Sequence, residues 1–307
     1  MRIAFLHNAL GKTDGVSLEV DKWREVLRRR GHEVFYIAGN ERDDILCIPE
    51  LSFYHPQTKK EIENATVALR DYKDGKELLE DINKSADIIK TQLFNIINEN
   101  KIELIIPNNL MSVGYHIAAL KAIYEIIEKT GIKTICHNHD FYFEDSGEVI
   151  QTCKEVEDML EKMAPPDLAN VENLVINKIA KAALFKKKNI SAKVVPNVFD
   201  FDMKAWSSNE YNCDFLEDFN IGKNDLIFLQ ATRVMDRKGI ELAIDIIGEL
   251  NRHKDRLIGK RLYNGKMFNE SGSIILLCAG IVENFGISSK YVDNLKKRAV
   301  ENTVDIR

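Results

Sequence analysis

The sequence has few of the features that mark secreted, membrane-spanning or zinc-stabilised proteins. Its five cysteines are scattered singly: Cys47, Cys136, Cys153, Cys213 and Cys278. Because no two of them form a CxxC pair, the pattern argues against a disulfide framework or a structural zinc site and indicates a reducing cytoplasm. The N-terminal stretch MRIAFLHNALGK has polar residues inside a short apolar run, which is not typical of a signal peptide. No run approaches the roughly 18–20 apolar residues that span a bilayer. Only peripheral contact with a membrane therefore stays open.

The chain also lacks a strong charge of either sign. It has 307 residues, 45% hydrophobic and 30% charged, with a formal net charge of −5. This composition is typical of a soluble globular protein and gives no reason to expect nucleic acid as a partner. The basic triplets at 28–30 and 186–188 end predicted helices, where cations offset the helix dipole. A chain of this length usually exceeds one hydrophobic core, so we expect two domains.

In the first two thirds of the chain, short apolar runs alternate with helical patterns. The predicted strands are RIAFLHN, HEVFYIAG, IELIIPNN, KTICHNH, NLVINKI and AKVVPN. Helical spacing of apolar residues predicts helices over 16–30 and 113–129 and a mainly helical segment over 59–101. Continuous apolar strands separated by helices indicate a parallel sheet covered on both faces, the doubly wound α/β class.

The stretch VVPNVFDFD interrupts this alternation and predicts a hinge, with domains over 1–197 and 198–307. After it the alternation restarts, with strands at DLIFLQATR and SIILLCAG and helices over 238–250 and 289–301. TVDIR opens another strand. Since the second part contains only two complete strand–helix units, we expect this domain to be incomplete.

Ligands of open α/β sheets bind at the carboxyl ends of the strands, so the loops after the predicted strands are candidate sites. The first loop, HNALGKTDGVS, lacks the P-loop spacing because Leu6 stands where the first glycine is required, and the chain has no GxGxxG motif, which disfavours a nicotinamide cofactor. Gly15 precedes a helix whose first backbone N–H groups can receive a phosphate or another polar group. The alternative is that Asp14 or Ser17 caps this helix.

The loop in ICHNHDFYFE carries His137, His139 and Asp140 directly after a predicted strand. The pattern HxHD can begin a binuclear metallohydrolase site, but its usual extension HxHxDH is broken here. The other five histidines form no second HxH or HxxH pair, so we disfavour a metal centre. Aromatic residues at 141–143 beside polar side chains suit a sugar or another ring-bearing ligand.

The loop in ATRVMDRKGIELAI combines three features that attract anions. Arg233 follows a predicted strand, and Lys238 and Gly239 precede an amphipathic helix. A guanidinium fork, an ammonium group and the positive end of a helix dipole together predict a diphosphate-binding site.

Taken in order, these loops resemble glycosyltransferase family 4, the retaining, nucleotide-sugar-dependent enzymes of the GT-B fold. The matching segments are TDGVSLEVDKWREVLRRRGHEV, HNHDFYFE, VVPNVFDFD as the PNxxD hinge, and RVMDRKGIELAI as the RxxxxKG signature. The resemblance covers nearly the whole chain. It implies two Rossmann-like domains, with the acceptor held by the first and the nucleotide sugar by the second.

The resemblance also implies roles for the candidate residues. Arg233 and Lys238, with Gly239 beside them, would neutralise the donor diphosphate, and Gly15 would let the backbone approach the donor. A histidine of the HNHD loop would hydrogen-bond the transferred sugar. The spacing does not decide between His137 and His139; Asp140 completes this set of candidate catalytic residues. Transfer would need no metal ion or further cofactor, and the acceptor would be a carbohydrate, a lipid or a small molecule.

One family signature has no counterpart here, a pair of glutamates eight positions apart after the second strand–helix unit. Glu241 and Glu249 have this spacing but follow the RxxxxKG motif directly, where the family does not place the pair. Two alternatives to a transferase therefore stay open. One is a non-catalytic binding protein on a GT-B scaffold, and the other a nucleotide-sugar epimerase or sugar-phosphate phosphorylase of similar build. Base recognition is expected around CAGIVENFG; the donor sugar, the acceptor and the oligomeric state stay open.

Overall fold

The computed structural model describes residues 1–144, 149–280, 282 and 288–307. The chain divides into two compact units, Met1–Phe201 and Asp202–Arg307. The division falls within the segment that contains the expected hinge. Each unit is built around its own parallel sheet.

The first unit contains a seven-stranded sheet in the order β3-β2-β1-β4-β5-β6-β7. Its strands are β1 (Arg2–Leu6), β2 (Glu33–Ala38), β3 (Ile45–Cys47), β4 (Leu104–Pro107), β5 (Lys133–Asn138), β6 (Val171–Val175) and β7 (Lys193–Val194). All neighbouring pairs are parallel, which confirms the predicted doubly wound class. The strand order reverses between β1 and β4, so their carboxyl ends form the topological switch point at which such sheets bind ligands.

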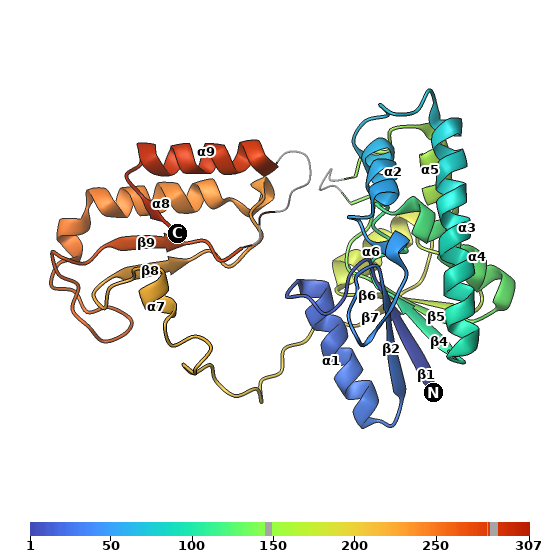
Figure 1. Ribbon diagram of the computed structural model, residues 1–307, viewed down its shortest axis with the longest axis horizontal. Helices are drawn as coiled ribbons and strands as arrows, with labels where there is room; N and C mark the ends of the chain where they lie inside the picture. Colours follow the sequence, from blue (N-terminus) through green and yellow to red (C-terminus); the bar gives the residue numbers. More distant parts are fainter. Residues whose placement is uncertain (145–148, 281, 283–287) are drawn as a thin grey trace. The chain divides into compact units, whose positions relative to one another are not determined.

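Helices cover both faces of this sheet (Figure 1). They are α1 (Gly15–Arg29), η1 (Pro49–Leu51), α2 (Pro56–Thr66), α3 (Gly75–Glu99), α4 (Ile117–Thr130), α5 (Lys154–Met163) and α6 (Lys178–Lys188). Alternate residues of a strand point to opposite faces. Ala4 and Leu6 of β1 accordingly pack with α3, α4 and α5, whereas Ile3 and Phe5 pack with α1. This alternation anchors β1 from both sides and fixes the position of the loop that follows it.

The second unit contains a three-stranded parallel sheet in the order β10-β9-β8. Its elements are α7 (Phe215–Asp218), β8 (Leu226–Leu229), η2 (Asp236–Lys238), α8 (Ile240–Arg252), η3 (Lys254–Leu257), β9 (Ile274–Leu277), α9 (Ser288–Glu301) and β10 (Asp305–Ile306). Ile244 and Ile247 of α8 pack on Ile274 and Leu276 of β9. The strand predicted at TVDIR is confirmed as β10, whereas the expected incompleteness of this domain stays a prediction.

None of the helices in the described part of the chain combines the length and the apolar composition needed to cross a bilayer.

Candidate functional site

The carboxyl ends of β1, β4 and β5 bring histidines and asparagines together at the switch point of the first sheet. His7 follows β1, Asn108 follows β4, and His137 is the second-last residue of β5. The Nδ1 atom of His7 donates a hydrogen bond to the main-chain carbonyl of Asn108, over 2.8 Å. Asn108 and His137 also pair as an isolated parallel bridge. The sheet register therefore sets the distances among these side chains.

His137 is held below the surface by its neighbours. Its side chain is 1% exposed, and its Nδ1 atom lies 3.0 Å from Oδ1 of Asn108. The imidazole packs against the indole of Trp23, with ring centroids 4.7 Å apart and planes at 31°. The ring of His139 lies next to it, at 4.5 Å between centroids. Two imidazoles and an indole thus form one contiguous aromatic cluster.

Asn109 ties the HNHD loop to the end of β4. Its Oδ1 atom accepts hydrogen bonds from the main-chain N–H groups of His139, at 2.7 Å, and Asp140, at 3.3 Å. Its Nδ2 group donates to the Asp140 carboxylate over 3.1 Å. One amide side chain therefore fixes both residues that the sequence places in the candidate catalytic set beside His137.

Burial keeps the histidines of this cluster neutral near pH 7. It lowers the pKa of His7 to about 4 and that of His137 to about 3. Burial also lowers the pKa of His139, although the carboxylates of Asp140 and Glu19 act in the opposite direction. A neutral imidazole offers one donor and one acceptor nitrogen. Within the described chain, the Nε2 atoms of His137 and His139 are buried without a hydrogen-bond partner, so both can serve a polar group that enters the site.

Residues of α1 and of the hinge segment complete the surroundings of His139. The buried carboxylate of Glu19 accepts a hydrogen bond from the indole N–H of Trp23, at 3.0 Å, and pairs with Lys22 at 2.5 Å. Lys22 also donates to the main-chain carbonyl of Val198. The amide nitrogen of Asn197 lies 3.4 Å from Nδ1 of His139. The PNxxD segment therefore contacts the histidine cluster inside the first unit.

The sequence pointed to the loops but missed several of these residues. Asn108 and Asn109 end the predicted strand IELIIPNN. Their position at the carboxyl end of a strand was the signal that could have marked them as site residues. Trp23 and Glu19 lie four residues apart on α1, and nothing in the sequence linked them to a loop more than 100 residues away.

Two of the aromatic residues after the HNHD loop are buried in the hydrophobic core, whereas the sequence predicted aromatic rings available to a ligand. Phe141 is 4% exposed and packs with α6 and Val175, whereas Tyr142 is 8% exposed and belongs to the core around α4 and α5. The ring of Phe141 stacks on that of Phe143 at 4.9 Å. Their hydrophobic area anchors the loop, and Asp140, directly before them, is exposed.

The start of α1 follows the capping alternative. Asp14 is the N-cap, and its Oδ1 atom accepts hydrogen bonds from the main-chain N–H groups of Val16 and Ser17, each at 3.0 Å. Burial alone would raise the pKa of Asp14, but these bonds and the Ser17 hydroxyl outweigh it and lower the pKa. A Cβ atom on Gly15 would meet no atom of the described residues within 4 Å. The role of Gly15 toward a ligand therefore stays a prediction.

In the second unit, Arg233, Lys238 and Gly239 lie on the single connection between β8 and α8. Gly239 is the N-cap residue of α8 and has φ +63°, a left-handed conformation that favours glycine. The side-chain amide of Gln230 donates to the hydroxyl of Thr232 at 3.0 Å and to the carbonyl of Lys238 at 3.4 Å, which braces the connection. Of the segment CAGIVENFG, which is expected to recognise the base, residues 281 and 283–286 lie outside the described residues.

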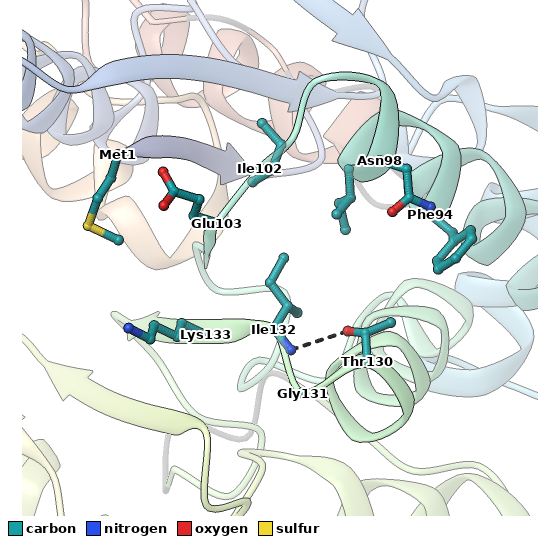
Figure 2. A pocket seen from close by; sticks show the side chains of 10 residues that line it. Met1, Phe94, Asn98, Ile102, Glu103, Thr130, Gly131, Ile132 and Lys133 are labelled. Carbon is teal, nitrogen blue, oxygen red and sulfur yellow. Dashed lines mark hydrogen bonds between the residues drawn. The ribbon is translucent and has the colours of Figure 1, made fainter.

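Two hollows of the first unit lie away from its histidine cluster. One, of about 390 Å³, is at the amino ends of the strands, between Met1, Glu103 and Lys133 (Figure 2). The other, of about 660 Å³, lies beside the start of β2. Because ligands of open α/β sheets bind at the carboxyl ends, we assign neither hollow to the substrate. Among the described residues, no group of three histidine, cysteine or acidic side chains could hold a metal ion.

Comparison with known proteins decides the family. No protein-family model matches the chain. Two curated relatives, the mannosylglucosylglycerate synthases of Petrotoga mobilis and Thermotoga maritima, are 34% and 36% identical to it over 308 and 312 residues. Each alignment covers all of this chain and 69% of the relative. The chain belongs to the mannosylglucosylglycerate synthase family. It is therefore an enzyme, a glycosyltransferase.

One solved structure resembles this chain in fold. Sucrose-phosphate synthase from Thermosynechococcus elongatus superposes with a TM-score of 0.58, covering all of this chain and 70% of that one, at 12% identity. At this identity the likeness concerns the fold alone, which is the GT-B type expected from the sequence.

Proposed function

We propose that this glycosyltransferase makes mannosylglucosylglycerate by transferring a mannosyl group from a nucleotide-diphosphate sugar to glucosylglycerate, with retention of configuration, as a member of glycosyltransferase family 4. The observation that carries the proposal is the 34–36% identity over the entire chain to two mannosylglucosylglycerate synthases. The name of that product contains a mannosyl group, a glucosyl group and glycerate, which supports mannose as the added sugar and glucosylglycerate as the acceptor.

Loss of a nucleoside diphosphate builds negative charge on the departing phosphate oxygens. We assign Arg233 and Lys238 to neutralise it, helped by the start of α8 at Gly239. Fixed cations stabilise this charge more in the transition state than in the ground state, which is the condition for raising kcat. The two side chains supply the positive charge themselves, so we propose a transfer that needs no metal ion or further cofactor.

The histidine cluster suits the transferred sugar. A sugar hydroxyl both donates and accepts hydrogen bonds, and neutral imidazoles offer matching atoms. We assign the Nε2 atoms of His137 and His139 to hydroxyls of the donor sugar, with Asp140 available to a further hydroxyl. Gly15, where a Cβ atom would meet no described neighbour, is assigned to let the donor approach the backbone at the start of α1.

The test is to incubate the chain with glucosylglycerate and with GDP-mannose or UDP-mannose, and to follow the products by mass spectrometry and NMR. We expect one mannosylated product whose new anomeric carbon has the configuration of the donor. Inversion at that carbon would contradict the retaining assignment. An epimerised donor without a glycoside would favour the epimerase alternative, and nucleotide-sugar binding without any product would favour the non-catalytic scaffold.

A further inference from the structure

The orientation of the Asn108 amide follows from its two partners. Its side chain is fully buried, and its Nδ2 group lies 3.0 Å from the main-chain carbonyl of Ile106. A carbonyl oxygen can only accept, so the amide NH₂ must face Ile106 and the amide oxygen must face His137. The reverse orientation would set two acceptors against each other in a buried site, which costs a hydrogen bond and adds repulsion.

This orientation determines the tautomer of His137. The Oδ1 atom of Asn108 can only accept, and it lies 3.0 Å from Nδ1 of His137. The Nδ1 atom must therefore carry the proton. In the neutral ring the Nε2 atom is then an acceptor, and it is the atom that is buried without a partner in the described chain. A buried acceptor of this kind is costly unless a ligand or a water molecule donates to it.

Asn109 adds a second constraint through its backbone. It has φ +54°, a left-handed conformation that asparagine adopts more readily than most residues. In that conformation its amide reaches the N–H groups of His139 and Asp140 and the Asp140 carboxylate. An aspartate at this position would repel Asp140, and a glycine would keep the conformation but lose all three bonds. Asparagine meets both requirements.

We propose that Asn108 and Asn109 are positioning residues for the histidine cluster, with Asn108 fixing the Nδ1-protonated tautomer of His137 and Asn109 fixing the backbone of His139 and Asp140. Through Asn108, the Nε2 atom of His137 is presented as an acceptor for a ligand hydroxyl. The inference rests on the proposed function only for the identity of that ligand, a sugar. The tautomer and the backbone constraint are properties of the protein alone and can be measured without substrate.

The tautomer is tested by two-bond ¹⁵N–¹H correlation spectra of the histidine rings of the chain at pH 7. His137→Gln identifies the signals of this ring by their loss. We expect His137 in the Nδ1-protonated form, with Nε2 at the shift of an unprotonated nitrogen. A ring protonated at Nε2, or on both nitrogens, would overturn the role of Asn108. Since the measurement uses the unaltered protein, its result does not depend on whether an Asn108 variant folds.

The backbone constraint is tested with Asn109→Gly. Glycine keeps φ +54° without strain, so the fold should persist. The amide hydrogens of His139 and Asp140 should exchange at least about ten times faster than in the unaltered chain, since they lose their acceptor. The kcat for sugar transfer should fall on the order of 10²-fold, as expected when a reacting group is displaced by about 1 Å.

Asn189→Gly is the matched control, because Asn189 has φ +56° at the end of α6. It should leave both the exchange rates at the site and the kcat unchanged. Faster exchange without loss of kcat in Asn109→Gly would contradict the positioning role while leaving the transferase intact. Unchanged exchange would contradict the hydrogen-bond assignment itself. If no transfer occurs even in the unaltered chain, the proposed function is wrong. The tautomer and exchange measurements still test the positioning roles, because they need no substrate.

Discussion

At the scale of single residues, the connection between β8 and α8 offers two arginines for comparison. Arg233 and Arg237 are both exposed on this connection, but only Arg233 is assigned to the diphosphate. Arg233→Ala should lower kcat/KM by roughly 10²–10³-fold, since it removes a cation that stabilises the leaving group. Arg233→Lys should recover part of this loss because it restores the charge but not the bidentate fork. Arg237→Ala should stay within about twofold of the unaltered chain in steady-state assays. Equal losses at the two positions would contradict the assignment.

Gly239 allows conformational strain to be separated from a role in binding. Its φ is +63°, so alanine there should cost roughly 1 kcal/mol of unfolding free energy. Gly259, in the same unit, has φ +79° and space for a Cβ atom, so Gly259→Ala carries a similar strain away from the candidate diphosphate site. Both variants should show comparable losses in urea unfolding, but only Gly239→Ala should raise KM for the nucleotide sugar. A parallel rise in KM for both would show that the effect of Gly239 is one of stability alone.

At the scale of an element, His116 connects the pH dependence of stability to the start of α4. Its Nδ1 atom accepts a hydrogen bond from the main-chain N–H of Ala119, and its Nε2 group donates to the carbonyl of Glu50 over 2.8 Å. Burial lowers its pKa to about 4, against an opposing effect of the bond to Glu50. The unfolded chain, with an ordinary histidine pKa near 6.5, therefore binds more protons than the folded one between about pH 6.5 and 4.

Because the unfolded chain takes up the proton first, the contribution of the neutral His116 to the free energy of unfolding is fully present above pH 6.5. It is lost as the pH falls toward 4. At pH 5 the loss amounts to about 2 kcal/mol. His116→Asn keeps an oxygen that can cap α4 and removes the titrating group. We measure the free energy of unfolding in urea at pH 7 and pH 5. Its decrease between these pH values should be smaller by about 2 kcal/mol in this variant than in the unaltered chain. An identical slope would mean that the His116 ring is already protonated in the fold or exposed to water.

The elements also show which parts of the fold could be predicted from the sequence. Long apolar strands such as β1 and β5 were predicted because both of their faces are buried, which gives uninterrupted hydrophobic runs. β3 was not predicted, since its three residues Ile45–Cys47 are too short to show a period. α5 was also missed, although Val156, Met159, Leu160 and Met163 carry a helical pattern and are buried in the structure. That omission was avoidable, whereas the one at β3 was not.

At the scale of the whole molecule, the candidate site depends on contacts that local patterns do not contain. The rule that ligands bind at the carboxyl ends of parallel strands identified the loops after His7, Asn108 and Cys136 as candidates. It could not show that the His7 ring meets the Asn108 carbonyl, because these residues are 101 positions apart. It also could not distinguish polar residues that face the site from aromatic ones that anchor it, since both follow β5 within five residues. Burial in the folded chain makes that distinction.

The division into two units leads to a prediction about the intact chain. Between Val194 and Phe215 the described chain forms neither helix nor strand, and Phe201, Trp206 and Tyr211 are 89%, 81% and 93% exposed. Exposed backbone of this kind is where proteases cut first. Limited digestion with chymotrypsin, which cleaves after aromatic residues, should first give two fragments matching the two units.

Changing Phe199, Phe201, Trp206 and Tyr211 together to serine should remove these first cuts without affecting the ordered elements, because all four side chains are exposed. Fragments would be identified by intact mass, and thermal unfolding would confirm that the variant keeps its fold. A first cut before Val194 would instead mean that the first unit opens more readily than the segment that follows it. That result would be at odds with the continuous core of Leu78, Ile82, Ile89 and Leu93 against β1 and β4.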